Sequence, residues 1–391
     1  MRVMLFGSRL EAIQQGKPTA HGQTFWLEMI PAIIDKVDQL LVASIGGRPS
    51  QGIGSVQVMR ILPFPLQLLY AGDCQGNDDL EDNYIVKTAL FAGAYRRVQE
   101  LVEKWGIDVI HLIENYGPIQ AALSRVEVAK SIFQLHYDPR YPMYDELLRL
   151  SLRPFDAIIT GSQAVAAKLR ELRVAPSAMI RSIPWGVPLD AFENHSTDRA
   201  DVRSHFGLDP NAKIVLWTGF ISTVVRIEEL LFSLEVAKKL VDEFADVVFV
   251  FAFKRQQFDR RYEQFEKDRV KVLSLGSRTE FLRLASVSSL LFSPCLNRRA
   301  ILGPPLTWLE CMAQGVPVVT TGVAGVDEIL QDDKNGIVVQ DADQVANRLR
   351  SLLRDHAKTE QLGRAAKETV RQKFGIEQVA DAYLQLWSSL V

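Results

Sequence analysis

Cysteine and long apolar runs are scarce in this chain of 391 residues. Its three cysteines, Cys74, Cys295 and Cys311, are widely spaced and form no metal-binding pattern. We therefore expect buried thiols in a reducing cytoplasm rather than disulfides. No run approaches the about 18 consecutive apolar residues of a membrane helix, so any attachment to a membrane should be peripheral, at its inner face. The opening MRVMLFGS is expected to be a strand and a turn, too short for a signal peptide.

The chain also lacks a charge imbalance. It has 45 basic and 47 acidic residues, a net charge of -2, which gives no global electrostatic reason to expect nucleic acid as a partner. Apolar residues make up 47% and charged residues 24%, a composition typical of globular proteins. The length exceeds what one hydrophobic core usually covers, so two domains are expected.

Short apolar runs, typical of buried strands, alternate with stretches of helical periodicity along most of the chain. A first strand and helix series ends near residue 172, a stretch rich in proline and polar residues follows at 183–201, and a second series spans 214–339. Three helices are expected after it, the last over residues 376–390. Regular alternation of this kind predicts two α/β domains, each with a parallel sheet covered on both faces.

The stretch at residues 297–328 carries the strongest local signal. Gly303 and two following prolines form a turn, so a helix should begin near Pro305 or Leu306 and end at Gly315 in a left-handed conformation. The start of such a helix presents free N–H groups and a positive dipole end, which favour phosphate. Glu310, one turn further on, could accept two hydrogen bonds from a ribose diol. The alternative is an ordinary strand-to-helix connection with a surface carboxylate.

Five motifs narrow the assignment further: IPWGVPLDAF at the junction, WTGF, VKVLSLGS, LGPPLTWLECMAQGVPVVTTGVAGVDEIL, and NGIVV. Together they resemble retaining glycosyltransferases of the GT-B fold, in particular the large glycosyltransferase family four (group 1). The resemblance implies two doubly wound Rossmann-like domains with a cleft between them. It places an acceptor-side domain at residues 1–185, a nucleotide-sugar domain at 186–373, and at 374–391 a helix that returns to the first domain.

The resemblance also assigns roles to residues of the second domain. It assigns Glu310 to the ribose hydroxyls of the donor. The backbone amides of Leu306 and Thr307, with the Thr307 hydroxyl, match the helix start that receives the diphosphate. Ser277 and Arg278 match the loop that frames the base.

Two positions depart from the family pattern. Leu302 stands where the family has a first glutamate for the sugar hydroxyls, so backbone amides around Leu302 and Gly303 are candidates for that contact. Phe220 stands at the family's arginine, and Arg226 lies close to the offset of its lysine, which makes Arg226 the candidate for neutralising the leaving diphosphate. For Arg226 the alternative is a solvated charge at a helix start.

In the first domain the resemblance points to His136 and Gly22. His136 ends the apolar strand expected at residues 132–136, in the sequence QLHYD, and would face the cleft near the anomeric carbon. The alternative is a histidine hydrogen-bonded at a strand end. Gly22 resembles the second glycine of a pair near the donor phosphates, with His21 in place of the first. His111 is interpreted instead as a core histidine with its hydrogen bonds satisfied.

These observations predict a cytoplasmic, metal-independent enzyme without a cofactor. It would move a hexose from a nucleoside diphosphate sugar, UDP-glucose or another UDP-sugar first and a GDP-sugar second, to a polysaccharide or lipid-linked glycan, with retention. Its partners would be donor and acceptor, and the oligomeric state is left open. A GT-B pseudoenzyme that binds nucleotide or a protein partner is the main alternative, motivated by Leu302 and Phe220. A nucleotide-sugar epimerase is the second.

Overall fold

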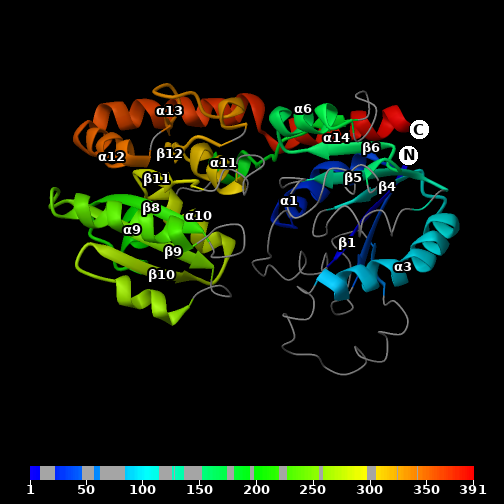
Figure 1. The fold of residues 1–391 in the computed structure, drawn as a ribbon, viewed down its shortest axis with the longest axis horizontal. Helices are drawn as coiled ribbons and strands as arrows, with labels where there is room; N and C mark the ends of the chain where they lie inside the picture. The colour runs from blue at the N-terminus through cyan, green and yellow to red at the C-terminus, as the bar shows by residue number, and fades with distance from the viewer. Residues whose placement is uncertain are drawn as a thin grey trace. The chain divides into compact units, whose positions relative to one another are not determined.

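The computed structural model describes fourteen parts of the chain, which are residues 1–8, 23–45, 57–61, 84–113, 126, 128–135, 152–173, 180–193, 198–219, 227–254, 259–296, 305–323, 325–340 and 342–391. The chain divides into two compact units (Figure 1). Unit 1 is Met1–Pro184 with Val379–Val391, and unit 2 is Trp185–Gln378. Within these described parts, no helix is both long and apolar enough to cross a membrane.

The strands and helices alternate along both units, as the sequence predicts. The strands are β1 Arg2–Ser8, β2 Gln39–Ile45, β3 Gln57–Ile61, β4 Val109–Leu112, β5 Lys130–Leu135, β6 Ala157–Thr160, β7 Ile180–Ser182, β8 Lys213–Gly219, β9 Val247–Lys254, β10 Val270–Leu275, β11 Leu290–Ser293, β12 Val318–Thr321 and β13 Ile337–Val339. The α-helices are α1 Gln23–Ile33, α3 Tyr84–Trp105, α6 Gln163–Glu171, α7 Asp190–Glu193, α8 Arg199–His205, α9 Ile227–Val241, α10 Arg278–Ser286, α11 Leu306–Ala313, α12 Val345–Arg354, α13 His356–Lys373 and α14 Ile376–Leu390.

Unit 1 is built on a parallel sheet with the strand order β3-β2-β1-β4-β5-β6-β7. One face of this sheet packs against α3 and α6 in a continuous apolar core. On the other face lie α1 and the final helix α14, whose buried residues include Tyr383 and Trp387. Helices cover both faces of the sheet, and β4 and β6 are completely buried, which gives the Rossmann-like layering that strand and helix alternation predicts.

The final helix α14 belongs to unit 1 through its aromatic side chains. The Tyr383 hydroxyl accepts a hydrogen bond from Gln134 Nε2 of β5 at 2.7 Å. The Tyr383 ring stacks on His111 of β4 with 5.6 Å between ring centroids, and Trp387 approaches the same ring at 5.9 Å. The closing segment therefore completes the core of the unit in which the chain begins.

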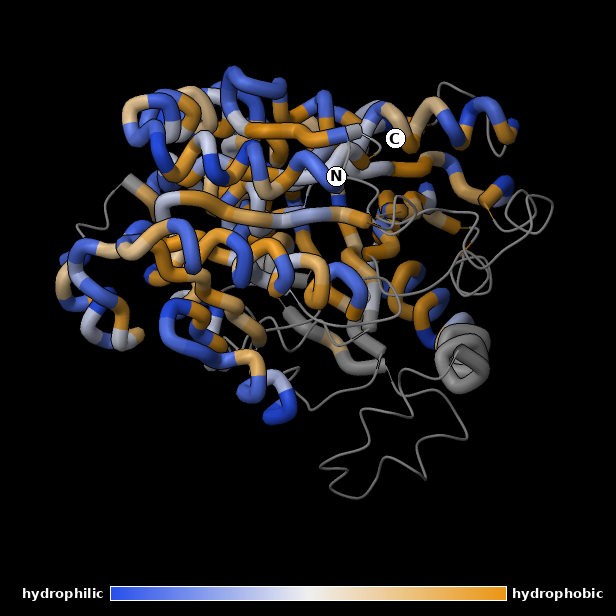
Figure 2. Tube along the Cα trace, turned by 60° about the vertical axis from the view of Figure 1, so that its left-hand side comes forward, coloured by the Kyte–Doolittle hydropathy of each residue, from blue (hydrophilic) through white to orange (hydrophobic). Residues whose placement is uncertain are grey.

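Unit 2 has a parallel sheet with the order β10-β9-β8-β11-β12-β13. Alternate residues of β8 face opposite sides. Ile214 and Leu216 join a core with α10, α11 and α13. Val215 and Trp217 join a second core with α9 and α12. Both faces of the sheet are thus covered, which accounts for the largely hydrophobic strands in Figure 2.

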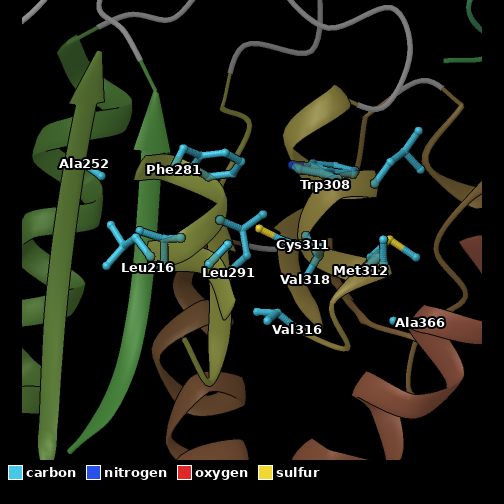
Figure 3. Close-up of a cluster of buried hydrophobic side chains, with 14 of the residues drawn as sticks. Leu216, Ala252, Phe281, Leu291, Trp308, Cys311, Met312, Val316, Val318 and Ala366 are labelled. Carbon is cyan, nitrogen blue, oxygen red and sulfur yellow. The ribbon is translucent and has the colours of Figure 1, made fainter. Parts of the chain in front are cut away.

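Helix α11 lies in the first of these cores. Figure 3 shows Trp308, Cys311 and Met312 of this helix among Phe281 of α10 and Leu291 of β11, and all five side chains are buried. Helix α13 packs against the end of α11, where Gly315 has a φ of +77°. A Cβ atom on Gly363 of α13 would overlap the Gly315 carbonyl oxygen, so only glycine fits at this crossing.

Several boundaries differ from those expected. Within the second strand and helix series, residues Arg260–Phe265 form a short 3₁₀ helix rather than an α-helix. It is begun by Asp259, whose carboxylate accepts from Arg261 N–H at 2.8 Å. The short strand β7 ends just before the break expected at 183–201, and helix α8 begins inside it. Proline and polar residues there favoured a loop, whereas pairing with β6 and an Asp198 cap stabilise regular structure.

Candidate functional site

The strand order of unit 2 reverses between β8 and β11. From β8 the chain continues through β9 and β10 on one side, whereas β11, β12 and β13 follow on the other. In open parallel sheets, ligands bind outside the carboxyl ends of the strands at such a switch point. Helix α9 follows β8 and helix α11 follows β11, so both helix N-termini belong to this edge of the sheet.

The N-terminus of α11 presents backbone N–H groups that make no hydrogen bond with other described residues. Pro305 is the residue before the helix, with φ −56° and ψ 141°, and its side chain makes no capping bond. The first bond of the turn runs from Trp308 N–H to Pro305 O at 2.9 Å. The amides of Leu306 and Thr307 therefore precede the helical hydrogen bonds, and both residues are half-buried. The helix begins at Leu306, where the sequence predicts it, and anion binding at this helix start remains a prediction.

Glu310 is not the surface carboxylate of the alternative interpretation. Its side chain lies on α11 and the residue is only 2% exposed. Arg278, the first residue of α10, donates from Nε to Glu310 Oε1 at 2.6 Å. A buried carboxylate needs a partner charge, and Arg278 provides one. Because an ionised carboxylate can accept about four hydrogen bonds, the ion pair is compatible with the predicted contact to a ribose diol.

The structure brings Arg278 to Glu310 but gives Ser277 a role in helix capping. The Ser277 hydroxyl accepts from Glu280 N–H at 3.2 Å and so begins α10. The Glu280 carboxylate in turn accepts from Gly276 N–H. These bonds fix the turn after β10 from which Arg278 extends.

Residues Ser293–Leu296, which are the last residue of β11 and the three that follow it, are bonded to three other elements; we call them the β11 exit segment. Thr321 of β12 accepts from Cys295 N–H at 2.8 Å and donates to Cys295 O at 2.6 Å. Thr320 donates to Ser293 O at 2.7 Å. On the other side, Trp308 Nε1 of α11 donates to the Ser293 hydroxyl at 2.8 Å. The exit segment and the first turn of α11 are thus held together.

A second buried carboxylate, Glu229, completes these contacts. It lies in the first turn of α9, is 3% exposed, and accepts from Leu296 N–H through Oε1 at 2.8 Å. Sequence reasoning did not select Glu229. The available signal was a pair of acidic residues at the start of an amphipathic helix, one of which falls on the apolar face.

The two described cysteines are buried, free and unreactive, as predicted. Burial, and secondarily the Glu229 carboxylate, raise the pKa of the Cys295 thiol to about 12. Burial and then Glu310 raise the pKa of Cys311 well above its usual value. A thiol of this kind is not a nucleophile at neutral pH, so neither side chain is a candidate for covalent catalysis.

Five of the predicted site residues lie outside the described residues: Gly22, His136, Arg226, Leu302 and Gly303. Their assigned roles remain predictions. His111 is described, and it is a core residue as expected. Its hydrogen bonding differs from expectation, because neither ring nitrogen has a partner among the described residues.

Comparison with known proteins was made on the whole chain. The family "Glycosyl transferases group 1" matches residues 212–355, and "Glycosyltransferase Family 4" matches residues 86–191. The two matches lie in different units and together cover more than half of the sequence. The chain belongs to the group 1 glycosyltransferases. This glycosyltransferase is 23% identical over 310 residues to spore coat protein SA of Bacillus subtilis, covering 73% of the chain and 79% of the relative.

Solved structures show the same fold over the whole length. Sucrose-phosphate synthase from Thermosynechococcus elongatus aligns with a TM-score of 0.74 at 19% identity, covering 100% of this glycosyltransferase and 99% of that chain. The Anabaena protein HepE, solved in complex with UDP-glucose, aligns with a TM-score of 0.72 at 17% identity over 100% of both chains. The glycosyltransferase therefore has the two-domain, Rossmann-like GT-B fold that the sequence predicts.

Proposed function

We propose that this glycosyltransferase transfers a hexose from a nucleoside diphosphate sugar to a hydroxyl group of a polysaccharide or lipid-linked glycan, with retention at the anomeric carbon. UDP-sugar is the preferred donor and GDP-sugar the second choice. One observation carries the proposal: the N-terminus of α11 lies at the switch point of unit 2, with the buried carboxylate of Glu310 one turn further along. The UDP-glucose complex of the structurally similar Anabaena protein supports UDP as the first choice.

The proposed chemistry follows from the leaving group. When the nucleoside diphosphate departs, negative charge develops on its β-phosphate. Backbone N–H groups of Leu306 and Thr307, together with the dipole of α11, are fixed before the reaction and would stabilise that charge. They supply electrostatic stabilisation of the kind that a divalent cation supplies in other transferases, so we propose that transfer proceeds without a metal. The leaving phosphate oxygen would take the acceptor proton on the same face of the sugar.

Glu310 is assigned to the ribose diol in this proposal. Glu310→Ala removes an acceptor of two charge-assisted hydrogen bonds, each worth about 1.5 to 3 kcal/mol. Affinity for free UDP should therefore fall together with affinity for the sugar donor. Asp201→Ala is the control, because this carboxylate is 67% exposed, pairs with Arg283 and makes no assigned donor contact.

The experiment combines calorimetry with product analysis. UDP, GDP and ADP are titrated into the wild type and both variants, and UDP-glucose turnover is followed with and without EDTA. Proton NMR of the freshly formed product reports the anomeric configuration. Wild-type protein that binds none of the three nucleotides, or UDP affinity unchanged by Glu310→Ala, would overturn the donor assignment. An inverted product would overturn retention, and loss of turnover in EDTA would overturn metal independence.

A further inference from the structure

The carboxylate of Glu229 bonds to the backbone of a segment that lies more than sixty positions later in the sequence. It is 3% exposed, yet the described contact of its Oε1 is with the Leu296 N–H, at 2.8 Å. Burying a carboxylate is costly unless hydrogen bonds compensate for lost water. A helix start can place acidic side chains in solvent at no such cost, as the exposed Glu228 in the same turn does. The inward orientation of Glu229 therefore needs a reason.

The contacts of the β11 exit segment explain why the Glu229 side chain points inward. Thr320 and Thr321 bond the segment to β12, and Trp308 Nε1 bonds it to the first turn of α11. Those bonds leave the Leu296 N–H for Glu229, which adds the connection to α9. The segment is thus linked on each side of the switch point, to the helix after β8 and to the helix after β11.

We propose that Glu229 is a positioning residue that holds the N-terminus of α11 in its donor-binding geometry through Leu296, Ser293 and Trp308. The proposal rests on the proposed function of that helix start. Glu229 itself touches neither donor nor acceptor in this account. Its effect reaches the Leu306 and Thr307 amides because Trp308 follows them directly in the same helical turn. Small displacements of such donors weaken binding strongly, since hydrogen-bond strength falls steeply with distance and angle.

Two variants separate the hydrogen bond from the charge. Glu229→Ala removes the acceptor for Leu296 N–H, whereas Glu229→Gln keeps a carbonyl oxygen at Oε1 and removes only the negative charge. We expect UDP affinity to fall about tenfold or more in Glu229→Ala and to stay within about threefold of wild type in Glu229→Gln, because a misplacement of about 1 Å can cost a hundredfold. Leu234→Ala, a core truncation one turn further along α9, is the control for general destabilisation and should leave UDP affinity unchanged.

Hydrogen exchange gives a second measurement that needs no ligand. The peptide containing residues 293–296 should exchange faster in Glu229→Ala than in wild type, Glu229→Gln or Leu234→Ala, because only Glu229→Ala frees the Leu296 amide. Unchanged exchange in Glu229→Ala would overturn the proposal. Faster exchange with unchanged UDP affinity would overturn the positioning role while retaining the anchor. A wild type that binds no nucleotide would overturn the proposed function instead, and the exchange result would still decide whether Glu229 holds the segment.

Discussion

The ion pair between Arg278 and Glu310 shows how one residue can serve both stability and the candidate site. Glu310 sits on the buried side of α11, and the Arg278 side chain remains 23% exposed. Removing one partner of a buried pair leaves an uncompensated charge, which costs more than the pair contributes. The arginine predicted to frame the base therefore has a structural task that its sequence position did not reveal.

Arg278→Ala should lower the free energy of unfolding by about 3 kcal/mol, because it removes a cation that pairs with the buried Glu310 carboxylate. Urea titration measures the change. Arg283→Ala on the same helix is the matched control: Arg283 pairs with Asp201 at 2.7 Å, but that carboxylate is 67% exposed, so the loss should be about 0 to 1 kcal/mol. Adding Glu310→Gln to Arg278→Ala should restore part of the stability. Equal losses in the two arginine variants would contradict the buried-pair account.

At the scale of elements, the crossing of α13 over the end of α11 depends on glycine at both contact points. Gly315 adopts a positive φ to end α11, as the sequence predicts, and Gly363 lets α13 approach its carbonyl group. In the middle of an exposed helix, replacing glycine by alanine stabilises by about 1 kcal/mol. Here the steric overlap acts in the opposite direction.

Gly363→Ala should therefore destabilise the protein by about 1 to 3 kcal/mol, the usual cost of overpacking a close contact. Thermal and urea unfolding report it. Gln361→Ala, an exposed position two residues earlier on α13, provides the comparison and should change stability little. A more stable Gly363→Ala protein would show that the two elements can separate without cost.

Most elements of both units were predictable because their signals are local. The runs at 157–160 and 270–275 are short and largely apolar, and they form the strands β6 and β10. The proline turn and Gly315 likewise fixed both ends of α11. What the sequence could not supply is contact between distant segments. Glu229 meets Leu296, and Arg278 meets Glu310, because the segments that carry these residues follow strands of the same parallel sheet. The carboxyl ends of those strands lie on the same side of the sheet.

At the scale of the whole molecule, the chain crosses from one unit to the other twice, after Pro184 and after Gln378. The two segments on the unit 2 side of these crossings are hydrogen-bonded to each other. Val187 N–H donates to Phe374 O and Val187 O accepts from Ile376 N–H, each at 2.9 Å. Beyond the second passage, α14 inserts Tyr383 and Trp387 into unit 1. The stability of unit 1 therefore depends on residues at both ends of the sequence.

His111 of β4 lies where α14 packs against unit 1, and the rings of Trp26, Tyr383 and Trp387 contact its imidazole. Burial lowers the pKa of His111 to about 3 from an ordinary value of 6.5, and the Gln134 side chain acts weakly in the opposite direction. The folded protein thus keeps this imidazole neutral, whereas the unfolded chain takes up a proton below about pH 6.5. The stability that His111 contributes is fully present above that pH and is lost as the pH falls toward 3.

Between pH 7.5 and pH 5 the wild type should lose about 2 kcal/mol of unfolding free energy through His111, since each pH unit below 6.5 weakens folding by about 1.4 kcal/mol. His111→Leu removes the titrating group and keeps an apolar side chain in the core. Between pH 7.5 and pH 5, the unfolding free energy of His111→Leu should therefore fall by about 2 kcal/mol less than that of the wild type. His356→Gln replaces an exposed histidine of unit 2 and is the matched control. Urea titrations of the three proteins at pH 7.5, 6 and 5 test this explanation.

Carboxylates whose pKa is lowered by ion pairs, such as Asp333, are protonated only at lower pH, so they do not obscure this interval. If His111→Leu lost stability as steeply as the wild type, the pH dependence would arise elsewhere, and the neutral imidazole beneath α14 would not be its cause.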